Sequence, residues 1–497
     1  MSLTSGPAAA RLLSSGGTVT RCYRPAISPG ISAGYTQTPV HVNQNQAGNY
    51  SPLHRVSSTL LPAMSLRRLL GLSSAAAFPG LLRRSFSFTT SGTPPPWAFI
   101  ERSTEAAEGL SVRLGHPPSL STIRVPKHLV RTSAAPDHDA DVIQSISGSV
   151  CSASSDGLLL LSYFDLRLEA PILAQRGAAR LRKSPADLAP GYGAHCTHFV
   201  CNPVTGELSC LPDPRTSDPV SKVMCGLHTG LLTRADGGHD GPPNRFAIAE
   251  LHGNQMVRFL SETGEWEVVP VSPCQLPDAR RMVLDHDVVA FGGRLWWLDV
   301  TCGAVSVDPF SDRPELCFVE LPRDSVLPAA AQDGCDCAGT SGCGESPEHR
   351  RLCVSEGRLR YIEVAREEPF VLSTFALDEE ASGWTLQHRL DLSRFRFQFQ
   401  DYCPHPWLPL KEGDTPQIGF LDPLDDSWIY MSATIANPED TPRFVFVVDM
   451  KKEDVIMCSA YRSGIPSFVP FVLPPWLGSS QIPAAGSDSL LNLLDYY

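Results

Sequence analysis

The chain has 497 residues, 42% of them hydrophobic, and a formal net charge of −12 at pH 7. Its first hundred residues hold no Asp, Glu or Lys and eight arginines: Arg11, Arg21, Arg24, Arg55, Arg67, Arg68, Arg83 and Arg84. Removing these eight from the 41 basic residues leaves 33 against 53 acidic ones. So acidic a body argues against nucleic-acid binding, and no apolar run approaches the roughly 20 residues of a membrane-spanning helix.

An arginine-rich, serine-rich and acid-free beginning is typical of an organellar transit peptide. We predict a disordered segment over residues 1–96, with the transit-like stretch at 64–90 and Met64 as an alternative start. The processing region is predicted at Arg83, Arg84, Ser85 and Phe86. The expected destination is the mitochondrion, with the chloroplast and then the cytoplasm or nucleus as alternatives. The competing interpretation is a disordered tail that lacks acids.

From residue 97 the pattern changes to short alternating or apolar runs separated by Gly, Pro, Asn and Asp, which predicts antiparallel strands. The main candidates are residues 157–168, 198–203, 245–251, 255–261, 287–293, 294–300, 351–365, 370–377, 426–432, 443–450 and 454–460. Helical periodicity is scarce between them. We therefore predict an all-β domain over residues 97–475.

The turns recur as well. Gly206, Gly264 and Gly383 each follow a strand and suit the left-handed position of a hairpin. The stretch "VVAFGGRLWWLDV" predicts an inner strand, a turn at Gly292 and Gly293, and a second strand. Trp296 and Trp297 should then point to opposite faces, one packing between units and the other covering a rim. Units repeat at roughly 45 to 60 residues, which favours a β-propeller of five or six blades.

The stretches "NPVTGELSCLP", "FGGRLWWLDVTCGAVSVDPFSDRPELCFVELP" and "RLCVSEGRLRYIEVA" with "FALDEEASGWTLQHRLDL" carry a family likeness. The chain resembles, over about residues 97–475, a large plant family expanded in grasses and known only as a domain of unknown function. That family is more distantly similar to the propeller-like part of kelch and F-box proteins. The resemblance implies the fold and no chemistry, and no F-box helix pattern precedes the domain.

Two aspartates before the inner strand are the first candidates for chemistry. Asp285 and Asp287 alternate along a strand and could share a face at the channel mouth, where paired carboxylates bind a cation or divide acid and base roles. Asp299 joins them as a candidate. The alternative is a solvated turn in which the carboxylates cap backbone amides.

The fifteen cysteines give no metal signature. Cys335, Cys337 and Cys343 lie in a Gly-rich stretch whose spacing differs from that of structural zinc sites, so an insertion between blades is predicted at 332–348. No phosphate-binding loop, nucleophile elbow or dinucleotide fingerprint occurs. A C-terminal tail is predicted at 476–497, after an apolar stretch that is a candidate closing strand.

The sequence therefore favours a non-catalytic β-propeller, imported into an organelle, that binds a protein partner without cofactor or metal. The alternative is a hydrolase-type enzyme with Asp285, Asp287 and Asp299 at the channel.

Overall fold

The computed structural model describes residues 93–132, 142–169, 195–213, 228–235, 241–274, 282, 284, 288–326, 349–367, 369–396, 416–433, 443–461 and 468–484. The chain divides into two units, Met1–Ala75 and Ala76–Tyr497, and every described residue lies in the second. The predicted processing region, the insertion at 332–348, and both Asp285 and Asp287 lie outside the described residues.

Four sheets are simple meanders in which each strand pairs with the next along the chain. The first holds β9 (Gly230–Arg234), β10 (Arg245–His252), β11 (Gln255–Leu260) and β12 (Glu265–Pro270). The second holds β13 (Val289–Phe291), β14 (Arg294–Asp299), β15 (Gly303–Val307) and β16 (Cys317–Glu320). The third holds β17 (Arg350–Ser355), β18 (Arg358–Val364), β19 (Val371–Leu377) and β20 (Trp384–Asp391). The fourth holds β21 (Gln417–Leu421), β22 (Trp428–Ala433), β23 (Arg443–Asp449) and β24 (Asp454–Tyr461).

The other two sheets hold the first eight strands of the domain and its last one. A seven-stranded sheet contains the meander β5 (Val142–Ala153), β6 (Leu159–Glu169), β7 (His195–Cys201) and β8 (Leu208–Cys210). It is extended by β2 (Ser103–Ala107), β4 (Thr122–Pro126) and β3 (Ser111–Arg113). The last sheet pairs β1 (Trp97–Glu101) with β25 (Phe468–Val472). Short 3₁₀ helices are η1 (Lys127–Leu129), η5 (Arg323–Ser325), η8 (Leu392–Arg396) and η9 (Pro475–Gly478).

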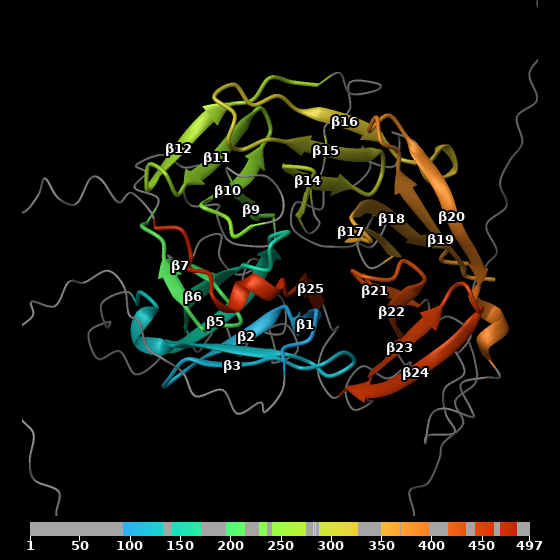
Figure 1. The fold of residues 1–497 in the computed structure, drawn as a ribbon, viewed down its shortest axis with the longest axis horizontal. Helices are drawn as coiled ribbons and strands as arrows, with labels where there is room; N and C mark the ends of the chain where they lie inside the picture. The colour runs from blue at the N-terminus through green and yellow to red at the C-terminus, as the bar shows by residue number, and fades with distance from the viewer. Residues whose placement is uncertain are drawn as a thin grey trace, which may run out of the picture. The chain divides into compact units, whose positions relative to one another are not determined.

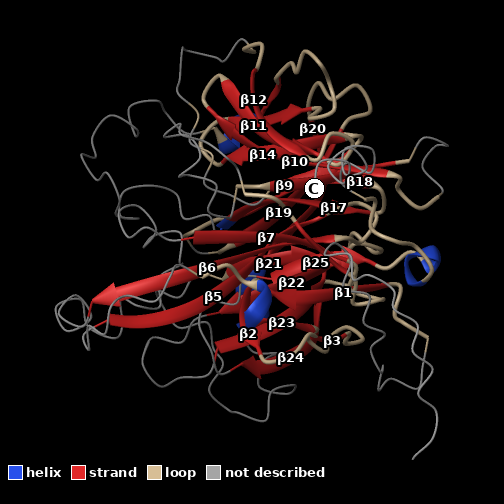
Figure 2. Cartoon of the chain, turned by 90° about the vertical axis from the view of Figure 1, so that its left-hand side faces the viewer, coloured by secondary structure: helices blue, strands red, loops and turns tan. Residues whose placement is uncertain are grey.

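The sheets are arranged in a ring (Figure 1). Their innermost strands contact one another in the order β5, β9, β13, β17, β21, β25 and back to β5. The ring closes because β25, near the C-terminus, pairs antiparallel with β1 from Trp97↔Val472 to Glu101↔Phe468. Such closure removes the open sheet edges that would otherwise be left unpaired. The protein is a six-sheet β-propeller, which confirms the predicted fold class and the closing strand, and strands dominate the described part from the side as well (Figure 2).

Three of the turns between the third and fourth strands of the blades share one device. A side-chain oxygen accepts a hydrogen bond from a backbone N–H two residues on at Asn202 (3.0 Å) and Asp308 (2.9 Å). Asp449 does the same at 3.1 Å. Short polar side chains favour such turns because they replace a backbone hydrogen bond. The same structural corner therefore recurs in the β5–β8, β13–β16 and β21–β24 meanders, the first, third and fifth along the chain.

The predicted glycine positions divide into two groups. Gly206 and Gly264 have φ values of 72° and 70°, and Gly292 and Gly293 have 59° and 70°. Gly383 differs: the left-handed residue of its turn is Ala381, with φ 52°. The turn there is longer, and the Asp378 carboxylate accepts hydrogen bonds from Ser382, so the left-handed residue comes two positions earlier.

The two tryptophans of β14 do lie on opposite faces, yet neither covers a rim. Trp297, fully buried, packs in the core shared with the β9–β12 sheet, and its indole N–H donates to the His228 carbonyl at 2.9 Å. Trp296 is 4% exposed and packs in the core shared with the β17–β20 sheet. The rim assignment was wrong because both faces of a propeller blade are covered by neighbouring blades. Within the described residues, no helix is long and apolar enough to span a membrane.

Candidate binding site at the channel mouth

A cavity of about 1190 Å³ occupies the channel and includes the turns that follow the innermost strands. Each of the six innermost strands contributes to its wall, so the site is built from strand ends on a closed ring. The apolar part of the lining includes Leu232, Val288, Ala290, Phe291, Leu352, Val354, Phe420, Val469, Phe471 and Val472. Phe291 confirms the prediction that the strand before Gly292 and Gly293 faces the channel.

Two arginines in the lining are bonded to strand carbonyls. The Arg102 Nη1 atom donates to the carbonyls of Val150 (3.0 Å) and Cys151 (2.8 Å). Arg351, on β17, donates to the carbonyl of Gly419 on β21 and to that of Phe468 on β25 at 3.3 Å. Each guanidinium group thus supplies a hydrogen-bond donor to strand carbonyls at the channel wall. Their first role is to hold the ring together.

Two thiols also line the cavity. Burial raises the pKa of Cys353 to about 12, so the group is a neutral thiol at physiological pH. Cys151 donates to the Ser162 hydroxyl at 3.0 Å. Both side chains therefore act in packing and hydrogen bonding, because the thiolate is the nucleophilic form of cysteine.

The rim of the cavity combines charge with exposed apolar surface. Asp156, in the β5–β6 turn, accepts a hydrogen bond from Thr233, and Arg234 pairs with Asp308 at 3.0 Å. The Glu356 side chain, in the β17–β18 turn, is 45% exposed and lies 3.9 Å from Arg360. Beside it Leu424, in the β21–β22 turn, is 49% exposed.

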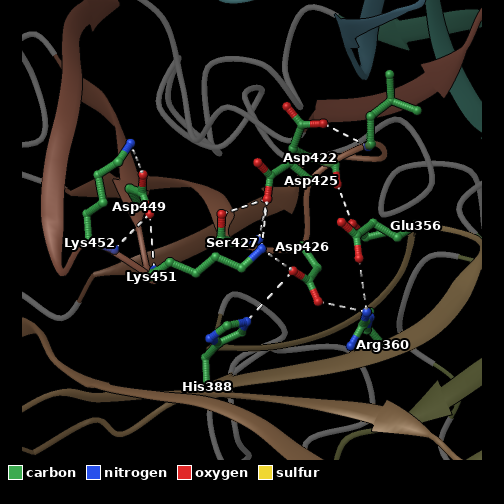
Figure 3. Close-up of polar contacts among 12 residues, drawn as sticks. Glu356, Arg360, His388, Asp422, Asp425, Asp426, Ser427, Asp449, Lys451 and Lys452 are labelled. Atoms are coloured by element: carbon green, nitrogen blue, oxygen red, sulfur yellow. Dashed lines mark hydrogen bonds and ion pairs between the residues drawn. The ribbon is translucent and has the colours of Figure 1, made fainter.

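An ion-pair cluster supports this side of the rim by joining the β17–β20 and β21–β24 sheets (Figure 3). The Asp426 carboxylate accepts from the guanidinium of Arg360 at 2.8 Å and from the ammonium of Lys451 at 3.2 Å. The His388 Nε2 atom lies 3.8 Å from the same carboxylate. Since Arg360 is buried, removing Asp426 would leave its charge with only the more distant and half-exposed Glu356 as a partner.

The titration of the cluster follows from these contacts. The hydrogen bond to Asp426 is the largest of the effects that raise the pKa of Lys451. Burial acts to raise the pKa of Asp425, but hydrogen bonds from Ser427 and the charge of Lys451 hold it below its usual value. Burial raises the pKa of Asp422. Lys451 and Asp425 therefore stay charged through the neutral pH range.

Three carboxylates of the cluster have the spacing of a metal site. Oxygens of Glu356, Asp425 and Asp426 lie within 4.8 Å of one another. These oxygens already face Arg360 and Lys451, so a divalent cation would have to displace two protein cations. The arrangement fits an ionic clasp between two blades better than a metal centre.

A second hollow of about 620 Å³ continues outward from the mouth. It shares Phe291, Gly292 and Gly357 with the cavity and lies between the second and third meanders. Its walls include Arg294, Trp296, Arg358, Leu377, Asp378, Glu379, Thr385 and Gln387. The cavity and this groove together form a continuous concave surface, called the mouth surface below.

Of the three aspartates predicted for catalysis, only Asp299 lies in the part of the chain that the structure describes. Asp299 is fully buried at the end of β14, where its Oδ1 atom accepts hydrogen bonds from the Thr301 amide (2.8 Å) and hydroxyl (2.6 Å). It caps the β14–β15 turn and is not part of the cavity lining. The enzyme hypothesis thus remains a prediction.

The structure also holds a polar group that the sequence analysis did not find. On β6 and β7 the Ser162 hydroxyl lies 2.8 Å from His198 Nδ1, and Cys196 Sγ lies 3.5 Å from His198 Nε2. Ser162 and His198 are cross-strand partners, a relation that strand alternation alone does not reveal. Both are buried and neither lines the cavity, so this pair belongs to the core of its blade.

The chain was compared with known protein families, curated proteins and solved structures. Residues 297–445 match the model of a family described as "Protein of unknown function (DUF1618)". No curated protein matches the chain.

Several solved structures are similar to the chain at low sequence identity. Apo AztD from Citrobacter koseri has a TM-score of 0.28 and 9% identity, over 75% of this chain and 97% of its own. The Cps50 (Swd1) β-propeller domain from Myceliophteria thermophila has a TM-score of 0.25 and 9% identity, over 66% and 88%. BamB from Moraxella catarrhalis has a TM-score of 0.23 and 9% identity, over 75% of this chain and 97% of its own. The fold assignment itself rests on the closed ring of sheets.

Proposed function

We propose that the protein is a binding module whose mouth surface takes a segment of a protein partner. The observation that carries this proposal is an exposed apolar side chain at the rim of an apolar cavity. Among the described residues, the large hydrophobic side chains that are exposed are Val268 (39%), Leu386 (47%) and Leu424 (49%). Only Leu424 of these three lines the cavity. Apolar surface concentrated at a concave site is typical of binding surfaces.

The architecture supports the same proposal. The mouth is made of short turns on strands fixed by their neighbours, so little conformational entropy is lost when a partner binds. Propellers present such turns on a rigid scaffold. The charged groups that line the cavity are largely bonded to the protein itself, which leaves shape and apolar contact as the main source of affinity.

The test uses two matched positions. A photo-reactive amino acid replaces Leu424 in one full-length variant and Val268, on the outer strand β12, in another. After irradiation in the protein's own cells, cross-linked products are identified by mass spectrometry. We expect one protein to be captured in near-stoichiometric amounts through position 424 and not through 268. Leu424→Asp should weaken its recovery about tenfold, the effect of a central interface residue. Equal capture through both positions would contradict the proposal.

We propose further that the segment 64–90 directs import into the mitochondrion. Its support is the absence of Asp and Glu from the first hundred residues together with the paired arginines Arg67 and Arg68, and Arg83 and Arg84. A fluorescent reporter carrying residues 64–100 should enter mitochondria, and the same reporter with these four arginines changed to Gln should not. Diffuse fluorescence of the first reporter would refute import, and its entry into plastids would show that the destination is the plastid and not the mitochondrion.

We also propose that the likeness to the unknown-function family extends from residues 297–445 to about 97–475, with a plant origin and a distant relation to kelch and F-box-associated propellers. The support is the side-chain-stabilised turn that recurs at Asn202, Asp308 and Asp449. Solved structures of plant members of that family should have six sheets and a closing C-terminal strand; a different blade number would refute the extension.

A further inference from the structure

We propose that the segment bound at the mouth surface is an extended peptide with an apolar residue followed by two basic residues about three positions apart. The apolar residue enters the cavity beside Leu424, and the basic residues contact carboxylates at the two ends of the groove. This inference rests on the proposed function and specifies the chemistry of the partner.

The face of the propeller that carries the mouth is acidic. In a meander, the turn between the first and second strands and the turn between the third and fourth lie at the same end of the sheet. The acidic residues in the described parts of these turns are Asp156, Glu207, Glu262, Asp308, Asp312, Glu315, Glu356, Asp378, Glu379, Glu380, Asp422, Asp425, Asp426 and Glu453. The basic residues in the described parts of the same turns are Arg313, Lys451 and Lys452.

Ion pairs neutralise only part of this charge. Arg234 pairs with Asp308, Arg245 with Glu262 and Arg360 with Asp426. Glu379 and Glu380 form no ion pair with any described residue. A partner segment that approaches this face therefore meets a negative potential, which favours a cation and disfavours a nucleic acid.

Two carboxylates stand on opposite sides of the mouth. Asp156 follows β5 and Glu356 follows β17, which are three places apart in the ring of six innermost strands. Of the arginines in the same lining, Arg234 is neutralised by Asp308, whereas Arg102 and Arg351 are hydrogen-bonded to backbone carbonyls. The entrance to the apolar cavity thus has a carboxylate on each of two opposite sides.

The groove carries carboxylates at its ends and two arginines, Arg294 and Arg358, between them, so a basic side chain is favoured at the ends only. Glu356 lies at its channel end, and Asp378, Glu379 and Glu380 lie at its outer end in the β19–β20 turn. Hydrogen bonds from Ser382 hold the pKa of Asp378 below its usual value, so this group stays anionic. Between the ends, Arg294 donates to the Ser306 hydroxyl at 2.9 Å and is occupied, and Arg358 is exposed.

The spacing of the basic residues follows from sheet geometry. The β17–β18 and β19–β20 turns are two strand separations apart, or about 10 Å. An extended chain advances about 3.3 Å per residue, so about three residues connect the two acidic ends. A compact helix would need more residues for the same span, because it rises only about 1.5 Å per residue.

The test uses two fluorescein-labelled peptides and the full-length protein. One contains the sequence Leu-Arg-Ser-Ser-Arg and the other Leu-Glu-Ser-Ser-Glu, and binding is measured by fluorescence anisotropy at low salt. We expect the basic peptide to bind with a Kd below about 1 mM and at least tenfold more tightly than the acidic one, and its binding to weaken as NaCl is added.

Charge-removing variants locate the interaction. Glu356→Gln should weaken the basic peptide about threefold, and the combined Glu356→Gln, Glu379→Gln and Glu380→Gln variant about tenfold or more, since exposed ion pairs are individually weak. Glu320→Gln, at the opposite end of its blade, should leave binding unchanged. Thermal unfolding of each variant checks that it is folded.

The outcomes separate this inference from the proposed function. Three results would contradict the proposal that the partner segment is basic. They are equal binding of both peptides, no binding of either peptide below 1 mM, and an effect of Glu320→Gln equal to that of Glu356→Gln. If cross-linking through Leu424 still captured a partner in that case, the proposed function would stand. If position 424 captured no more than position 268, the proposed function itself would fail.

Discussion

Replacing Phe99 by Ala should open the ring at its closure. Phe99 lies on β1, is 1% exposed, and its ring centroid lies 5.1 Å from that of Phe420, 5.4 Å from Phe468 and 5.8 Å from Tyr430. A buried Phe→Ala substitution costs about 3–5 kcal/mol, and each aromatic pair contributes about 0.5–1.5 kcal/mol beyond buried area. With three such neighbours we expect the free energy of unfolding to fall by about 5 kcal/mol. This is a large part of the total for a typical domain, which is about 5–15 kcal/mol.

The free energy of unfolding is measured by urea titration of the full-length protein, followed by tryptophan fluorescence. The matched control is Leu386→Ala, whose side chain is 47% exposed on the outer strand β20, and which should change stability by less than about 0.5 kcal/mol. A double-mutant cycle with Phe468→Ala should give a coupling of about 0.5 kcal/mol or more, because the two rings touch across the closure. A loss below about 1 kcal/mol for Phe99→Ala would refute the reasoning.

Three further predictions concern single contacts. Gly157→Ala should lower stability by about 2 kcal/mol or more in thermal unfolding, because Gly157 has φ 85° and a Cβ there would meet the Val472 carbonyl; no change would contradict the close approach of β25. Asp426→Asn should cost about 3–5 kcal/mol by urea titration because buried Arg360 loses its nearest charged partner, and adding Arg360→Met should restore part of the loss. No recovery in the double variant would contradict this. Burial raises the pKa of Cys353 to about 12 in the folded protein, whereas the same thiol in the unfolded chain ionises near pH 9. The free energy of unfolding should therefore fall by about 1–2 kcal/mol through this group between pH 8 and 10. Cys353→Ala should show a correspondingly shallower decline, and an unchanged slope would count against the buried thiol.

The fold could be predicted from the sequence because its signals are local and repeated. Runs of alternating apolar and polar residues recur in each meander, and Gly206 and Gly264 mark turns in two of them. A two-residue turn between apolar runs marks the inner hairpin at Gly292 and Gly293. Each signal needs only a few neighbouring residues, so it survives without knowledge of the rest of the chain.

The site could not be predicted in the same way because it depends on which blades become neighbours. Glu356 and Asp426 are far apart in sequence, and only the packing of two sheets brings both beside Arg360. Similarly, the role of Arg351 appears only when β17, β21 and β25 face one another across the channel. Local patterns directed attention instead to Asp285, Asp287 and Asp299, of which Asp299 proves to be a turn cap.

The same contacts that close the ring prepare the mouth surface for binding. Arg351 ties the carbonyls of two other innermost strands, and the Asp426 cluster ties two sheets directly beneath the rim residues Glu356 and Leu424. Groups that hold the scaffold are therefore neutralised or hydrogen-bonded, whereas the groups left for a partner are an apolar side chain and exposed carboxylates. A surface fixed in this way loses little entropy on binding, so modest apolar contact suffices for affinity, and the acidic turns act mainly on the rate of encounter and on the choice between partners.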